Sequence, residues 1–171
     1  MSGDWTVGSD GDRAWLAADG RRFACAIGRG GIRTDKREGD GATPVGRFPL
    51  RRLLYRPDRL PRPATGLPVV AIGRDDGWCD DPGHADYNCP IRLPHPARHE
   101  RLWRDDPLYD LVVVIGHNDM PVVAGAGSAV FVHVARDGYA PTEGCVALTA
   151  ADLLHLLARA TTDTRLVVEA P

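Results

Sequence analysis

The chain has 171 residues, 43% of them hydrophobic, and a formal net charge of -2. A chain of this length buries a sizeable core without metal or disulfide staples, so we expect residues 1–171 to form a single domain. Its basic residues are scattered, which excludes the concentrated positive charge of a nucleic-acid-binding surface. No stretch approaches the length of a membrane span, and no export signal is visible at the N-terminus.

The first third of the chain reads as short strands joined by tight turns. The 19 glycines and 14 prolines predict many turns and little long helix, and therefore a mainly β fold. Alternating apolar residues and turn signals predict strands at 5–7, 14–17 and 21–28. After the glycine-rich segment 39–46, a further strand is expected at 47–54.

Residues 57–107 are proline-rich and irregular, apart from an apolar stretch at 67–72. Loops this long in a compact domain are either functional or disordered. The tryptophan, tyrosine and two cysteines in "GWCDDPGHADYNCP" favour order. We therefore expect an ordered, loop-rich insertion that covers part of a cleft.

The last third contains the clearest periodic segments. The continuous apolar run at 109–118 predicts a central strand buried on both faces, and 128–134 predicts a second strand. One helix is expected to begin after Thr149, a plausible N-cap with Asp152 three residues on. A final strand is expected at 164–170.

The segment "FVHVARDGYAPTEGCVAL" (131–148) combines a nucleophile, a base and a flexible backbone position. A thiol becomes nucleophilic beside a base or a helix N-terminus, and Cys145 is expected to have both, with His133 as the base. Gly144 would let a substrate carbonyl approach backbone N–H groups that form an oxyanion hole. On these residues alone, the alternative of a core cysteine and a structural histidine stays open.

Two motifs together resemble the L,D-transpeptidase catalytic domain, the YkuD-like family. The family pattern of a histidine, a bend, Ser or Thr, any residue and Gly-Cys is met by His133, Thr142, Gly144 and Cys145. Upstream, "ATPVGRF" (42–48) is similar to the family's Thr-Pro-x-Gly-x-Phe element. The resemblance spans about residues 20–169.

The resemblance implies a β-sandwich or barrel with one short helix after the cysteine, and no cofactor or metal. It implies acyl transfer between peptidoglycan stem peptides through a Cys145 thioester, with a monomer acting in the periplasm or cell wall. Since no export signal is visible, action in the cytoplasm, export by another route and a sequence lacking its leader all stay open. Residues expected to contact substrate are Thr142, Glu143, Trp78, Asp80, Tyr87, His117 and Asn118, with Glu143 expected to receive a diaminopimelate ammonium.

Three functions remain open from the sequence. The first is a transpeptidase that forms 3-3 cross-links, or 1-3 cross-links as in short compact relatives. The second is a carboxypeptidase or endopeptidase that hydrolyses the same thioester. The third is a catalytically silent binder of wall peptides, favoured by Glu143 and Val146, which depart from the commonest family residues.

The spacing Cys79-x4-His84-x4-Cys89 resembles part of a zinc knuckle but lacks a first pair of cysteines. Asp80, His95 and His99 are conceivable further ligands. A disulfide between Cys79 and Cys89 stays open, and so do two free thiols. We expect no metal.

Overall fold

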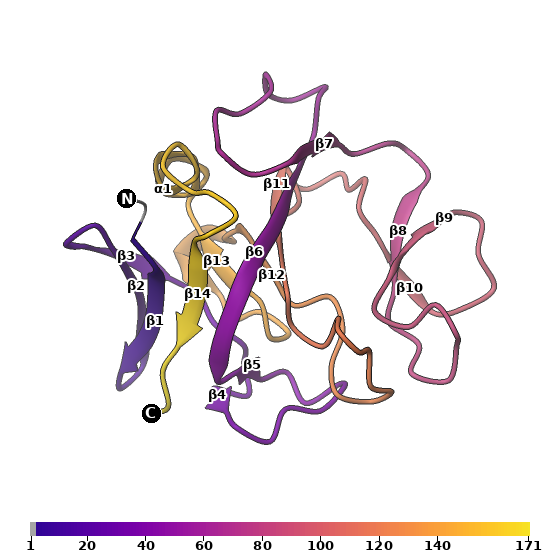
Figure 1. The fold of residues 1–171 in the computed structure, drawn as a ribbon, viewed down its shortest axis with the longest axis horizontal. Coiled ribbons are helices and arrows are strands. Elements are labelled where there is room, and N and C mark those ends of the chain that lie inside the picture. The colour runs from indigo at the N-terminus through magenta and orange to yellow at the C-terminus, as the bar shows by residue number, and fades with distance from the viewer. Residues whose placement is uncertain (1–2) are drawn as a thin grey trace.

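The glycine- and proline-rich turns divide the chain into many short strands. In the computed structural model, which describes residues 3–171, nine strands form one near-closed, barrel-like sheet with the path β13-β12-β11-β6-β14-β1-β2-β3, and β7 pairs with β6 (Figure 1). These strands are β1 (Trp5–Asp10), β2 (Arg13–Ala18), β3 (Arg21–Cys25), β6 (Gly46–Tyr55), β7 (Val69–Ala71), β11 (Leu111–Ile115), β12 (Phe131–Val134), β13 (Val146–Leu148) and β14 (Arg165–Val168).

The remaining elements are small. The insertion at 57–107, expected to be irregular, holds a three-stranded sheet in the order β10-β8-β9, which lies on the opposite side of β6 and β11 from β1–β3 (Figure 1). Its strands are β8 (Asp76–Cys79), β9 (Pro90–Arg92) and β10 (His99–Arg101), and β4 (Ile32–Arg33) pairs with β5 (Thr43–Pro44). The helical elements of the described chain are a 3₁₀ turn (Asp137–Tyr139) and α1 (Ala150–Leu157).

The predicted mainly β fold with one short helix is confirmed. Helix α1 begins after Thr149, whose hydroxyl accepts a hydrogen bond from the Asp152 N–H at 3.2 Å. Its leucines at 153, 156 and 157 are buried, which fixes the helix against the barrel. No helix in residues 3–171 is long and apolar enough to span a membrane.

Strand β11 is buried on both faces, as its continuous apolar run predicts. Leu111, Val113 and Ile115 pack into the barrel core, whereas Val112 and Val114 join a second core. The second core includes Trp78 and Leu102 of the insertion. The insertion therefore covers the outer face of the strands that carry the candidate site.

One expectation about the cysteine is wrong: Cys145 does not lie at a helix start. Strand β13 separates it from α1, because buried Val146, Ala147 and Leu148 pair in parallel with β12. The N–H groups at the start of the helix therefore lie beyond a strand and do not stabilise a Cys145 thiolate directly.

The barrel closes next to Cys145. Ala26, just after β3, exchanges two backbone hydrogen bonds of 2.8 and 2.9 Å with Ala147 of β13. A further bridge joins Gly28 to Thr142, with the Arg29 N–H donating to the Thr142 carbonyl at 2.8 Å. The segment after β3 thus supports the loop that precedes the cysteine.

Candidate active site

Cys145 lies at the start of β13 with its sulfur held between two backbone groups. The Phe131 N–H donates to Sγ at 3.3 Å, and the thiol donates to the Ala129 carbonyl at 3.2 Å. The residue is 8% exposed. Burial raises the pKa of the Cys145 thiol to about 12, and the nearby Glu100 charge adds to this effect. The resting sulfur is therefore a neutral thiol.

His133 lies on β12, on the same face as Phe131 and one strand from the cysteine. Its Nδ1 lies 2.9 Å from the Val134 carbonyl oxygen, which can only accept, so Nδ1 carries the proton of the neutral ring. Nε2 then carries the lone pair, and no donor to it is found within residues 3–171. Burial lowers the pKa of His133 to about 4, with further lowering by Arg104 and Arg136. A neutral imidazole of this tautomer is ready to accept a proton.

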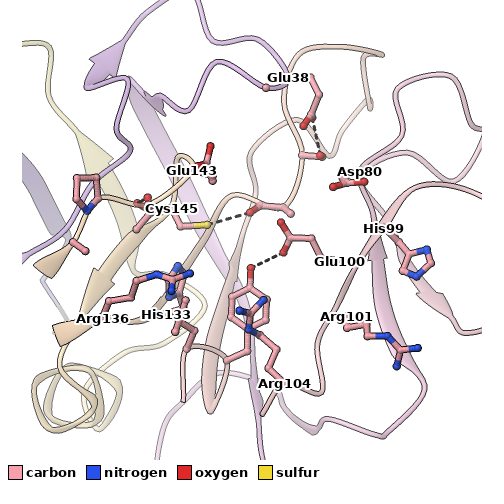
Figure 2. A pocket seen from close by; sticks show the side chains of 18 of the residues that line it. Glu38, Asp80, His99, Glu100, Arg101, Arg104, His133, Arg136, Glu143 and Cys145 are labelled. Carbon is pink, nitrogen blue, oxygen red and sulfur yellow. Dashed lines mark hydrogen bonds between the residues drawn. The ribbon is translucent and has the colours of Figure 1, made fainter. Parts of the chain in front are cut away.

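The two residues line one cavity of about 640 Å³ (Figure 2). The loop at 140–143 forms one wall, and the insertion supplies Asp80, residues 99–101 and Arg104. No hydrogen bond joins Sγ to the imidazole in the described chain, and the thiol donates to the Ala129 carbonyl instead.

Thr43 connects the two sequence motifs. Its hydroxyl accepts a hydrogen bond from the Gly28 N–H at 2.9 Å and donates one to the Gly144 carbonyl at 2.9 Å. Gly144 has φ +131°, and a Cβ atom there would lie 2.7 Å from the Ala42 carbonyl oxygen. The glycine before the cysteine is therefore required by the upstream motif that packs against it.

The backbone donors near the sulfur differ from the expected set. The Gly144 N–H already donates to the Thr142 hydroxyl at 3.1 Å, and that hydroxyl donates to the Cys145 carbonyl at 2.6 Å. For the Cys145 N–H we find no acceptor within residues 3–171. The Cys145 N–H is thus a backbone donor next to the sulfur that has no partner among residues 3–171.

The chain matches a known protein family along most of its length. Residues 9–168 match the family model of the YkuD L,D-transpeptidase catalytic domain. The chain belongs to this family. No curated protein and no solved structure matches it. Membership implies L,D-transpeptidase-type activity on peptidoglycan peptides, carried out in this family by a cysteine.

Three of the predicted substrate contacts line the cavity of this L,D-transpeptidase domain: Thr142, Glu143 and Asp80. The Glu143 side chain is 77% exposed and lies 2.9 Å from Arg29 Nε. It sits at the rim, already paired with a cation. Asp80 accepts from Arg98 Nε at 3.0 Å and lies on the insertion side of the cavity (Figure 2).

The other four predicted contacts lie outside the cavity lining and make contacts within the protein. Trp78 is 4% exposed and packs edge-on against Phe131 at 5.0 Å. The Tyr87 hydroxyl donates to Glu38 at 2.5 Å, and Asn118 bonds the backbone of its own loop. The His117 ring lies 3.2 Å from the Ala126 carbonyl and does not contact His133. These side chains stabilise the strands and loops behind the site.

Asn88 is a positioning residue that sequence reasoning missed. Its side chain accepts from the Trp78 indole at 3.0 Å and from the Ala129 N–H at 3.1 Å. It donates to the carbonyls of His117 and Asn118 at 3.1 and 2.8 Å. Asn88 therefore ties the insertion to the segment whose carbonyl accepts the Cys145 thiol. An asparagine in a loop carries no sequence signal of such a role.

We expect Asn88→Ala to lower the free energy of unfolding by about 3 kcal/mol, because it leaves two buried N–H donors without acceptors. Urea denaturation followed by tryptophan fluorescence measures this change. Replacement of the exposed Arg62 by alanine is the control and should change stability by less than about 0.5 kcal/mol. A loss below about 1 kcal/mol at Asn88 would contradict a central role for its hydrogen bonds.

The zinc-knuckle residues do not form a ligand set. All four cysteines are free, and the group close enough to share an ion in the described chain is His84, Asp86 and His95. The Nδ1 atoms of both histidines accept backbone N–H bonds, from Asp86 at 3.1 Å and from Ala97 at 3.2 Å. The neutral rings therefore carry their proton on Nε2, and the cluster is explained by hydrogen bonding within the protein.

Proposed function

We propose that the protein is a peptidoglycan L,D-transpeptidase that joins stem peptides through a thioester on Cys145. The observation that carries the proposal is the buried thiol in one cavity with a neutral histidine whose Nε2 is free. A neutral thiol that can give up its proton, and a neutral imidazole that can accept one, support acyl transfer more than they support silent binding. Because its substrate belongs to the cell wall, the proposal places the action of the protein in the periplasm or wall.

The first half-reaction forms the thioester. His133 takes the thiol proton as Sγ attacks a stem-peptide carbonyl, and the Cys145 N–H donates to the resulting oxyanion. The imidazolium then gives its proton to the departing amine, so the peptide C–N bond breaks and the S–C bond remains. Arg104 and Arg136 disfavour the imidazolium, which favours rapid delivery of that proton.

The second half-reaction resolves the thioester with an amine of a second stem. The low exposure of Cys145 supports aminolysis over hydrolysis, since a buried thioester is reached by few water molecules. The new amide bond is the cross-link, and the thiol is regenerated.

Incubation of the purified protein with disaccharide-peptides tests this proposal. We expect dimers whose mass equals two stems less the leaving group, because acyl transfer to an amine exceeds transfer to water. Mass spectrometry of the dimers also identifies which donor residue is joined, and so distinguishes 3-3 from 1-3 linkage. Shortened monomers without dimers would instead establish a hydrolase, and unchanged monomers together with no labelling by a β-lactam would establish a silent binder.

A further inference from the structure

A half-buried carboxylate, Glu100, and the buried Tyr109 line the same cavity as Cys145. The Tyr109 hydroxyl donates to Glu100 at 2.5 Å, and both residues line the cavity with Cys145 and His133 (Figure 2). Glu100 belongs to β10, and Tyr109 precedes β11. The Tyr109 ring also packs edge-on against the His133 ring at 5.3 Å. This pair is not part of the family pattern recognised in the sequence.

Glu100 differs from the other carboxylates of the cavity in having no ion-pair partner within residues 3–171, although the charge of Arg104 acts on it from nearby. Glu38 and Asp80 are paired with Arg98, and Glu143 is paired with Arg29. No ion pair to Glu100 is present in residues 3–171, and the nearby Arg104 is engaged by both oxygens of Asp106 at 2.8 and 2.6 Å. A half-buried carboxylate without an ion-pair partner is incompletely compensated, so it is suited to a cationic ligand.

The charge on Glu100 opposes the first half-reaction. Burial raises the pKa of Glu100 itself, and its charge contributes to the raised pKa of the Cys145 thiol. An anion at this place makes a thiolate harder to form. Its presence is consistent with a function in the second half-reaction, where the incoming group is a cation.

We infer that Glu100 binds the ammonium of the acceptor stem and takes its first proton, with Tyr109 as the positioning residue for the carboxylate. The inference rests on the proposed transpeptidase function and assigns the acceptor site. It also moves the ammonium contact from the exposed Glu143, expected from the sequence, to the half-buried Glu100.

The proton balance requires two acceptors. An ammonium loses two protons on the way to an amide. The first passes to the Glu100 carboxylate and leaves a neutral amine, and the resulting carboxylic acid later releases it to solvent. The second passes to His133 as the amine attacks the thioester, and His133 returns it to the departing Cys145 thiolate.

Glu100→Gln keeps the size of the side chain and removes its charge. We expect the ratio of dimer to hydrolysed donor to fall about 10-fold or more, because the acceptor stays protonated. Acylation by a β-lactam, which needs no acceptor amine, should stay equal or become faster, because the charge opposing the thiolate is gone. General structural damage would instead lower both activities.

Two further variants complete the test. Glu100→Asp, which retains the charge, should recover part of the dimer yield, and Tyr109→Phe should lower the ratio in the same direction as Glu100→Gln. The exposed and distant Glu169→Gln is the matched control and should leave both readouts unchanged. An unchanged ratio in Glu100→Gln or Tyr109→Phe protein that still acylates overturns this inference alone. Wild-type protein that leaves the monomers unchanged and that no β-lactam labels overturns the proposed function and the inference with it.

Discussion

Cys145→Ala protein will form no covalent adduct with a β-lactam, and its rate of stem-peptide cleavage will fall by at least about 10⁴-fold. The alanine fits the space of the thiol, because the surrounding contacts are backbone groups of Phe131 and Ala129. The buried Phe131 N–H loses its acceptor, so stability should fall by about 1 kcal/mol, which leaves the protein folded while the thiol is lost. Intact-protein mass spectrometry after exposure to the β-lactam measures the adduct directly.

The buried Cys25 is the internal control for this experiment. Burial raises the pKa of Cys25 to about 12, as it does for Cys145, but Cys25 lies on β3 and outside the active-site cavity. Cys25→Ala should therefore retain full labelling. Persistence of the adduct in Cys145→Ala would show that another group is the nucleophile.

His133→Gln will lower the rate of β-lactam acylation by about 10³-fold, since glutamine cannot accept the thiol proton. Stopped-flow or timed mass spectrometry gives the rate. Because the side chain of His133 also packs against Tyr109, thermal unfolding of the variant separates loss of the base from loss of packing. A rate within about 10-fold of the wild type would exclude His133 as the base.

The pH profile of the wild type provides a second measurement of the same residue. Burial lowers the pKa of His133 from 6.5 to about 4, so the base stays neutral as the pH falls through 6.5 and is lost only near pH 4. Acylation should be flat from neutral pH to about pH 5 and then decline. A half-maximal rate at pH 6.5 would contradict the buried, neutral histidine.

Strands and the helix could be predicted where the order of apolar and capping residues along the chain shows which faces are buried or where an element begins. The uninterrupted apolar run of β11 identified a strand covered on both faces, and Thr149 with Asp152 identified the start of α1. Strand β13 was not predictable, because three apolar residues are too few to show a period. Their partners, in β12 and at Ala26, are brought together by the closed sheet.

The site was predictable to the extent that its residues share one segment. His133 and Cys145 lie in a single motif, so their spacing and the bend between them predicted that they lie near each other, and both line one cavity. No short-range sequence pattern shows which side chains in this region face the cavity. Glu100 and Asn88 belong to the insertion, and Tyr109 follows it. Trp78 and Tyr87 were expected at the cavity because their segment leads to it. Instead, the Trp78 ring packs in the second core, and the Tyr87 hydroxyl donates to Glu38.

The place of β14 has a consequence for synthesis of the protein. This strand lies between β6 and β1, pairing antiparallel with the first and parallel with the second. The N-terminal hairpin strands therefore cannot join the sheet through their main neighbour until residues 165–168 have left the ribosome. The pairing of β1 with β14 thus joins segments far apart in the sequence, and such long-range pairing makes assembly slow.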